Sequence, residues 1–223
     1  MTTPKVIFFD INETLLDMQA IRHGLANVLN GDDTLVDVWF ANLLHHSLVD
    51  IASSQYHDFI DIGAAALVMV AYSKDISLDI ELAKKTIAEH ITALPAHDDV
   101  APTLKALKEA NVKLVALSNS SQAGLTKQLK FAEIHHYFDH VLSVESICAY
   151  KPHPNVYHWA CQQAGTANRD AMMVAAHGWD VSGAKATGMQ TTFVSRPGKM
   201  MYPLGLEPDF TVSSLYELVE LMS

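Results

Sequence analysis

The sequence predicts an α/β fold, with a doubly wound, mostly parallel sheet and a helical cap inserted after the first strand. Short runs that are apolar at every position recur along the chain, which is typical of strands buried on both faces. Stretches with helical spacing alternate with these runs, which indicates right-handed crossovers between parallel strands. Between residues 16 and 95, by contrast, only helical spacing occurs.

The first buried strand is predicted at Val6 to Phe9 and ends at Asp10. The later apolar runs that predict strands are Val112 to Leu117, Val141-Leu142, Met172 to Ala176 and Thr191 to Val194. The stretches that predict the core helices are Val100 to Glu109, Gln122 to Phe131, Asn155 to Ala164, Val181 to Ala186 and Ser214 to Met222. Predicted helices and strands therefore alternate from Val100 to the end of the chain.

The segment that follows the first strand predicts four helices. They are expected around Ile21 to Leu29, Val36 to Leu48, Phe59 to Val70 and Ile80 to Ile91. Turn-forming residues separate them at Asn30-Gly31, at Ser53-Ser54 and from Lys74 to Ser77. We therefore expect an α/β core domain made of residues 1–15 and 96–223, and a helical cap domain made of residues 16–95.

Composition narrows the class of protein. The 223 residues carry 25 acidic and 15 basic side chains, for a net charge of −10, and 49% of them are hydrophobic. A net anion has little attraction for nucleic acid or for an anionic membrane, so we expect neither as a partner. A membrane-spanning helix needs about 20 consecutive apolar residues, and no run reaches that length. The two cysteines form no metal or disulfide pattern, which favours a cytoplasmic location.

Polar residues follow three of the predicted strands. Asp10 follows the first, Ser118-Asn119 the second, and the segment from His177 to Asp180 follows the strand that begins at Met172. Ligands of open α/β sheets bind beyond the carboxyl ends of the strands, where these residues should meet. A single Asp after a strand is more often a turn residue, but the convergence of three such segments predicts an active site.

These segments resemble the motifs of the haloacid dehalogenase superfamily. Phe8 to Asp17 resembles its first motif, and Leu117 to Ser120 its second. Ala149 to Pro152 resembles the third, and Val174 to Asp180 resembles the fourth as it occurs in the 2-haloacid dehalogenase branch. The likeness spans essentially the whole chain and includes the early helical cap. It implies the Rossmann-like fold of that superfamily.

Two residues separate the main chemistries of this superfamily. A phosphatase of this kind needs an acid two residues after the nucleophile and a Mg²⁺ ligand near the fourth strand, where this chain has Asn12 and Ala176. A halide leaves as a stable anion and needs neither. The resemblance therefore implies hydrolysis of a short 2-haloacid to a 2-hydroxy acid through an ester on Asp10, with no metal or organic cofactor. A Mg²⁺-dependent phosphate-ester hydrolase and a non-catalytic protein that binds a small carboxylate remain alternatives.

The resemblance implies catalytic roles for five residues. Asp10 would attack the carbon that bears the halogen, and Lys151 would keep Asp10 ionised. Thr14 would orient Asp10, with a purely structural role in the turn as the alternative. Asp180 would anchor Lys151 or the hydrolytic water. His177 stands where the branch usually has Asn, and two roles remain open for it: a general base toward water, or a neutral hydrogen-bonding residue.

The residues expected to contact the substrate are Ile11, Asn12, Ser118, Asn119, Tyr157 and Trp179. For Ser118 and Asn119 a helix-capping role is an equal alternative, and for Tyr157 and Trp179 a core role is.

The chain departs from the 2-haloacid dehalogenase branch in its cap. Those enzymes place an arginine just after a tryptophan on the second cap helix, whereas Trp39 is followed here by Phe40 and Ala41. Arg22 is the candidate for its replacement. The apolar cap positions and the resemblance together lead us to expect a homodimer through the cap.

Overall fold

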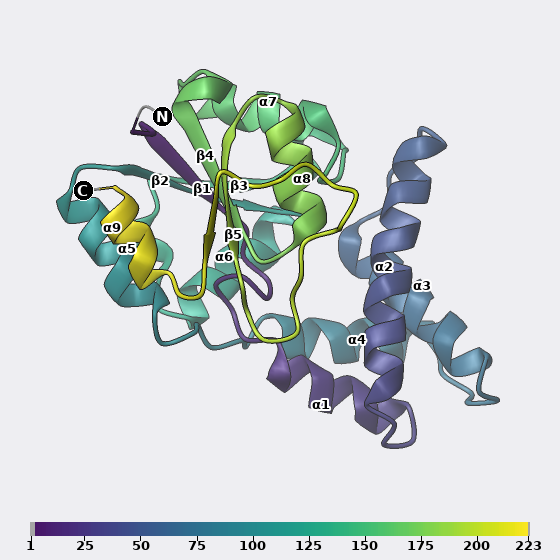
Figure 1. Ribbon diagram of the computed structural model, residues 1–223. Helices are drawn as coiled ribbons and strands as arrows, with labels where there is room; N and C mark the ends of the chain where they lie inside the picture. The colour runs from purple at the N-terminus through teal and green to yellow at the C-terminus, as the bar shows by residue number, and fades with distance from the viewer. Residues whose placement is uncertain (1–2, 223) are drawn as a thin grey trace.

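The computed structural model describes residues 3–222 and contains a six-stranded sheet (Figure 1). Its strands are β1 (Val6–Phe9), β2 (Lys113–Ser118), β3 (His140–Ser143), β4 (Ala171–Ala175), β5 (Gln190–Val194) and β6 (Phe210–Val212). They lie in the order β3-β2-β1-β4-β5-β6, and every pair is parallel. The predicted fold class is therefore confirmed.

Helices cover both faces of this sheet. α5 (Val100–Glu109) and α9 (Tyr216–Leu221) pack against each other on one face, and α7 (Pro154–Gln163) and α8 (Gly178–Ala186) pack against each other on the other face (Figure 1). α6 (Gln122–Phe131) packs beside β3. This two-sided covering explains why the strands are apolar at nearly every position.

The central position of β1 determines where the polar residues meet. Phe9 pairs with Ala116 of β2 on one side and with Val174 of β4 on the other. The residues that follow these three strands therefore emerge together at one edge of the sheet. All four side chains of β1 are at most 3% exposed, so the strand is anchored in the core on both faces.

The cap consists of α1 (Gln19–Val28), α2 (Thr34–Ala52), α3 (Phe59–Tyr72) and α4 (Ile80–Ile91). These helices pack on one another and stand to one side of the sheet (Figure 1). The chain leaves the core beside the point where it returns, because Leu16 and Ala96 form an antiparallel bridge. The N–H of Asp17 donates to Pro95 O at 2.8 Å, and that of His97 donates to Leu15 O at 3.0 Å. The two connections between the core domain and the cap therefore lie side by side, which supports domain boundaries at residues 15/16 and 95/96.

Besides small shifts at the ends of several elements, the structure differs from the sequence prediction at β6 and at the start of α8. β6 was not expected, because this three-residue edge strand contains an exposed Thr211 instead of a continuous apolar run. α8 begins at Gly178, not at Val181, because glycine is a poor helix former and hides the first turn. A Cβ on Gly178 would lie 2.8 Å from the backbone nitrogen of Tyr202, so only glycine fits this close approach. No helix within residues 3–222 has the length and apolar run that crossing a membrane requires.

A buried ion pair ties the loop after β1 to the rest of the core. Arg196 donates to both oxygens of Asp99 at 2.8 Å, and its Nε donates to Thr14 O at 3.0 Å. The N–H of Leu215 also donates to Asp99, at 2.9 Å. Burial opposes ionisation of Asp99, but the hydrogen bonds from Arg196 and Leu215 outweigh it and lower the pKa of this carboxyl. The pair thus holds together the starts of α5 and α9 and the loop that carries Thr14.

We predict that Asp99→Asn lowers the free energy of unfolding at pH 7 by about 3 kcal/mol, because the guanidinium of Arg196 is left buried without a charged partner. Because the pKa of Asp99 is lowered by folding, its contribution is present above the unfolded pKa and is lost as the pH falls through the folded pKa. Urea unfolding at several pH values measures this difference. The control is Glu109→Gln, which removes an exposed pair and should cost less than about 0.5 kcal/mol. Equal stability of the two variants would contradict the prediction.

Candidate active site

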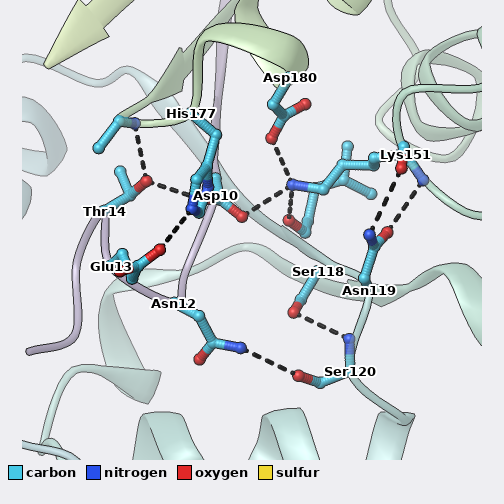
Figure 2. Close-up of polar contacts among 12 residues, drawn as sticks. Asp10, Asn12, Glu13, Thr14, Ser118, Asn119, Ser120, Lys151, His177 and Asp180 are labelled. Carbon is cyan, nitrogen blue, oxygen red and sulfur yellow. Dashed lines mark hydrogen bonds and ion pairs between the residues drawn. The ribbon is translucent and has the colours of Figure 1, made fainter. Parts of the chain in front are cut away.

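Asp10 lies at the carboxyl end of β1, and its side chain is buried in a network of hydrogen bonds (Figure 2). Lys151 Nζ donates to its Oδ1 at 2.8 Å, and Thr14 Oγ1 donates to its Oδ2 at 2.7 Å. Thr14 is itself fixed, since the N–H of Ala176 donates to its Oγ1 at 2.9 Å. Three segments that are far apart in the sequence therefore orient one carboxylate.

The ammonium of Lys151 is fully used. Besides Asp10, it donates to Asp180 Oδ2 at 2.5 Å and to Leu117 O at 3.1 Å, which accounts for its three N–H bonds. Burial alone would lower the pKa of Lys151, but the charges of Asp10 and Asp180 outweigh it and raise that pKa. Tyr157 donates to Asp180 Oδ1 at 2.7 Å and holds this carboxylate from behind. Lys151 is therefore a fixed cation.

The pKa values of the two carboxylates around Lys151 are shifted in opposite directions. Burial opposes ionisation of Asp10, but Lys151 and His177 outweigh it and hold the pKa of Asp10 well below its usual range. Burial raises the pKa of Asp180; Lys151 counteracts this, but the nearby charge of Asp10 adds to the rise. Asp10 is thus the carboxylate kept ionised, as a nucleophile must be.

The residues that follow β2 shape the neighbouring backbone. Asn119 Oδ1 accepts the N–H of Lys151 at 2.9 Å, so it fixes the loop that carries the lysine. Ser118 Oγ accepts the N–H of Ser120 at 3.1 Å. Asn12 donates to Ser120 Oγ at 3.4 Å and accepts from Gln128 at 2.8 Å. These polar side chains are therefore held in place by the fold.

His177 lies between two carboxylates. Its Nδ1 is 2.9 Å from Asp10 Oδ2, and its Nε2 is 2.8 Å from Glu13 Oε2 (Figure 2). A carboxylate oxygen only accepts hydrogen bonds, so both ring nitrogens must carry a proton. Burial opposes this charge, but the hydrogen bonds to Asp10 and Glu13 outweigh it and raise the pKa of His177 to about 9. Neither role expected from the sequence fits, because the imidazolium has no lone pair to take a proton from water and is not neutral.

Sequence reasoning missed two charged groups near His177, Glu13 and Lys199. Lys199, in the loop between β5 and β6, lies 2.6 Å from Glu13 Oε1. The His177 ring stacks between Phe40 of α2, at 6.1 Å between centroids, and Trp179, at 5.0 Å. Glu13 stands within the first motif and could have been considered, whereas nothing in the sequence connects Lys199 to this site.

A small cavity of about 20 Å³ lies against Asp10, enough for about one water molecule. It is lined by Asp10, Asn12, Phe40, Leu44, Phe59, Ser118, Asn119, Lys151, His177 and Trp179. Of the expected site residues, Thr14 and Asp180 act behind this lining through Asp10 and Lys151. Ile11 and Tyr157 are buried away from the lining, so the structure does not support their expected contact with substrate.

A larger apolar cavity of about 250 Å³ lies next to the first, between the cap and α6. It shares Asn12, Phe40 and Phe59 with the small cavity and extends past Leu43 and Ile87. Half of its lining residues lie in the cap helices α2, α3 and α4. The site therefore has a polar end at Asp10 and an apolar end beneath the cap.

Arg22, the candidate replacement for the cap arginine, lies elsewhere. It pairs with Asp37, and both line a separate cleft of about 850 Å³ on the α1 side of the cap. The structure therefore does not bring Arg22 to Asp10. Within residues 3–222, no group of three or more His, Cys, Asp and Glu side chains is arranged to hold a metal ion.

Comparison with known proteins agrees with this arrangement. The profile of the haloacid dehalogenase-like hydrolase family matches residues 7–194. The chain belongs to this family. Haloacetate dehalogenase H-2 of Moraxella sp. (strain B) is 29% identical over 220 residues, covering 98% of both chains. (S)-2-haloacid dehalogenase of Pseudomonas sp. (strain YL) is 28% identical over 218 residues, covering 97% of this chain and 94% of that one.

The solved structures share the family's fold. L-2-haloacid dehalogenase of Xanthobacter autotrophicus superposes with a TM-score of 0.91 at 24% identity, covering 98% of each chain. The resemblance inferred from the four motifs is therefore confirmed over the whole chain, the helical cap included.

We predict that His177 titrates near pH 9 in the folded protein, as measured by NMR of its imidazole. A group whose pKa is raised by folding stabilises the protein below its unfolded pKa, about 6.5 for His, and that stability is lost as the pH rises through the folded pKa. The difference in unfolding free energy between the protein and His177→Asn should therefore shrink by about 2–3 kcal/mol between pH 6.5 and 9.5. A His177 that titrates at its ordinary value, with no such change in stability, would contradict the prediction.

Proposed function

We propose that this protein is a hydrolase of carbon–halide bonds that converts a short 2-haloacid to a 2-hydroxy acid through an ester on Asp10. The observation that carries the proposal is the buried, ionised carboxylate of Asp10, which lines the cavity and is held by Lys151, Thr14 and His177. The names of the relatives from Moraxella and Pseudomonas, a haloacetate dehalogenase and an (S)-2-haloacid dehalogenase, support the substrate class.

The hydrogen bonds assign the attacking oxygen. Oδ2 accepts from Thr14 and His177, whereas Oδ1 accepts only from Lys151. Oδ1 therefore keeps a lone pair that can attack the carbon bearing the halogen, in line with the departing halide. A buried carboxylate is also poorly solvated, so attack requires little removal of water. The halide leaves as an anion and needs no proton.

Hydrolysis of the ester completes the cycle. Water attacks Cγ of Asp10, the 2-hydroxy acid leaves with Oδ1, and the oxygen of the water restores the carboxylate. Thr14 and His177 already point at Oδ2, where negative charge develops during this attack. One donor of this kind typically contributes about 3–4 kcal/mol to such a step. Asp180 anchors Lys151 throughout.

The residues present do not favour phosphate-ester hydrolysis. Asn12 cannot protonate a leaving alkoxide, and its amide is engaged by Ser120 and Gln128. Ala176 has no ligand to offer a cation. The ionised Asp10 beside the cavity opposes any anionic ligand, a haloacid included, so turnover of a haloacid is what separates an enzyme from a binding protein without chemistry.

We predict that Asp10→Asn lowers halide release from chloroacetate or 2-chloropropionate by at least about 10³-fold, because an amide is not a nucleophile. Ion chromatography measures the halide, and mass spectrometry of the quenched wild-type protein should find the mass of the added carboxyalkyl group on the peptide that contains Asp10. Asp170→Asn, at an exposed pair with Lys5, is the matched control and should retain the rate.

Two outcomes would count against this function. Full halide release by Asp10→Asn would refute the covalent route. Hydrolysis of an aryl phosphate that depends on added Mg²⁺, with no halide release, would establish the phosphatase alternative instead.

We also propose a homodimer through the cap, while the cytoplasmic location stays a prediction. Exposed apolar side chains gather on α2 and α3, among them Leu48 at 46%, Met69 at 51% and Tyr72 at 82%. Exposed apolar side chains on these two helices favour this side of the cap for the interface. Light scattering should give the mass of two chains, and Leu48→Glu should reduce it to one. The control is Leu204→Glu, which changes an exposed residue on the α/β core domain, away from the cap. A wild-type mass of one chain would refute the dimer.

A further inference from the structure

A chain of alternating charges leads from the nucleophile to solvent. Asp10 Oδ2 is 2.9 Å from His177 Nδ1, His177 Nε2 is 2.8 Å from Glu13 Oε2, and Glu13 Oε1 is 2.6 Å from Lys199 Nζ. Exposure of the side chains rises along it, from 7% at Asp10 and His177 to 21% at Glu13 and 25% at Lys199. Glu13 and Lys199 line the polar cleft on the α1 side of the cap.

The charges around His177 change when the ester forms. In the resting protein the imidazolium lies between two carboxylates, Asp10 and Glu13. Alkylation of Oδ1 removes the charge of Asp10 and turns Oδ2 into the carbonyl oxygen of an ester. Glu13 is then the one carboxylate still in contact with the ring, while the ring itself stays buried.

We propose that Glu13, held by Lys199, is a positioning residue that keeps both nitrogens of His177 protonated while Asp10 carries the ester. The proposal rests on the function proposed above. A neutral His177 beside Glu13 would keep its proton on Nε2 and would turn a bare Nδ1 toward Oδ2. Two lone pairs would then face each other. With Glu13 in place, Nδ1–H continues to donate to Oδ2.

This donor acts in the hydrolytic step. The oxygen of water forms a bond to Cγ, and the electron pair of the carbonyl moves onto Oδ2, where the N–H of His177 and the hydroxyl of Thr14 receive it. The Cγ–Oδ1 bond then breaks, and Oδ1 leaves in the 2-hydroxy acid. One proton of the water is transferred to Oδ1 as the product leaves. The other proton passes to solvent, where it balances the charge of the released halide. His177 donates a hydrogen bond and transfers no proton.

The other groups that face His177 do not replace Glu13. Phe40 of α2 and Trp179 of α8 stack on its two faces and carry no charge. Lys151 shares Asp10 with it and, as a cation, disfavours a second positive charge nearby. Asp180 of α8 is bound to Lys151 and Tyr157. Glu13 is therefore the group whose removal should alter the protonation of His177.

The backbone of Glu13 supports this role. Its φ is 62°, in the left-handed region that residues with a Cβ rarely adopt. Its N–H donates to Leu16 O at 3.0 Å, which closes a tight turn after β1. That turn places the carboxylate back over the end of the strand, on His177.

The test is rapid-quench kinetics of Glu13→Gln with 2-chloropropionate. We expect a halide burst of about one equivalent per site at the wild-type rate, followed by turnover slowed roughly 10-fold, because a neutral ring still donates from Nδ1 but makes an uncharged and weaker hydrogen bond. The ester should accumulate on Asp10 by mass spectrometry, and the alkaline limb of the kcat profile should move to lower pH. Lys199→Met should give a smaller change in the same direction. Lys185→Met, which removes a comparable partly buried pair with Asp209, should give none.

NMR titration of His177 gives a second readout. In Asp10→Asn, whose amide is uncharged like the ester, His177 should remain protonated at pH 7. Adding Glu13→Gln should make it neutral there. Halide release by the wild type with an unchanged burst, pH profile and titration in Glu13→Gln would overturn this inference alone. Absence of halide release by the wild type would overturn the proposed function, and this inference with it.

Discussion

A single buried ammonium determines the charge state of the whole site. Burying an ionised group costs free energy unless a partner of opposite charge compensates it. The three N–H groups of Lys151 donate to Asp10, Asp180 and Leu117 O, and its side chain is 1% exposed. Without it, Asp10 and Asp180 would repel each other in a buried space, and one of them would have to take up a proton. The ionised nucleophile thus depends on a lysine that lies 141 residues further along the chain.

The departures of this chain from the 2-haloacid dehalogenase branch meet in space. The cap carries Phe40 after Trp39 where the resemblance leads one to expect an arginine nearby, and the fourth motif carries His177 in place of an asparagine. Phe40 stacks on His177, which is itself positively charged. The charged ring of His177 lies beside Asp10, but it belongs to the core domain and not to the cap, and it is paired with Glu13. The cap thus lacks the expected arginine, and the fourth motif provides a positive charge at His177 close to the same place.

The sequence predicted the features of this structure that depend on neighbouring residues better than those that depend on contacts between distant segments. Buried strands such as Val6–Phe9 and amphipathic helices such as Phe59–Tyr72 are encoded locally, by apolar period, and were predicted closely. The short edge strand β6 lacks that signal. In the site, motif positions identified Asp10, Thr14, Lys151 and Asp180, which the structure brings together.

The protonation of His177 and the contribution of Lys199 could not be predicted, because both depend on how loops far apart in the sequence pack. Two acceptor oxygens on one ring decide the charge of His177, and a sequence shows neither distance. The expected substrate contacts of Ile11 and Tyr157 stay predictions, because neither side chain lines the cavity at Asp10. Proximity in a motif does not say which side of the backbone a side chain occupies.

The adjacent crossings at Leu16 and Ala96 have a mechanical consequence. Phe40 belongs to the cap, whereas His177 and Trp179 belong to the core domain. Any outward movement of the cap about this crossing would therefore uncover one side of the charged ring and let water reach it. Entry of a small molecule by that route would change the hydration of the charge that lies beside the nucleophile.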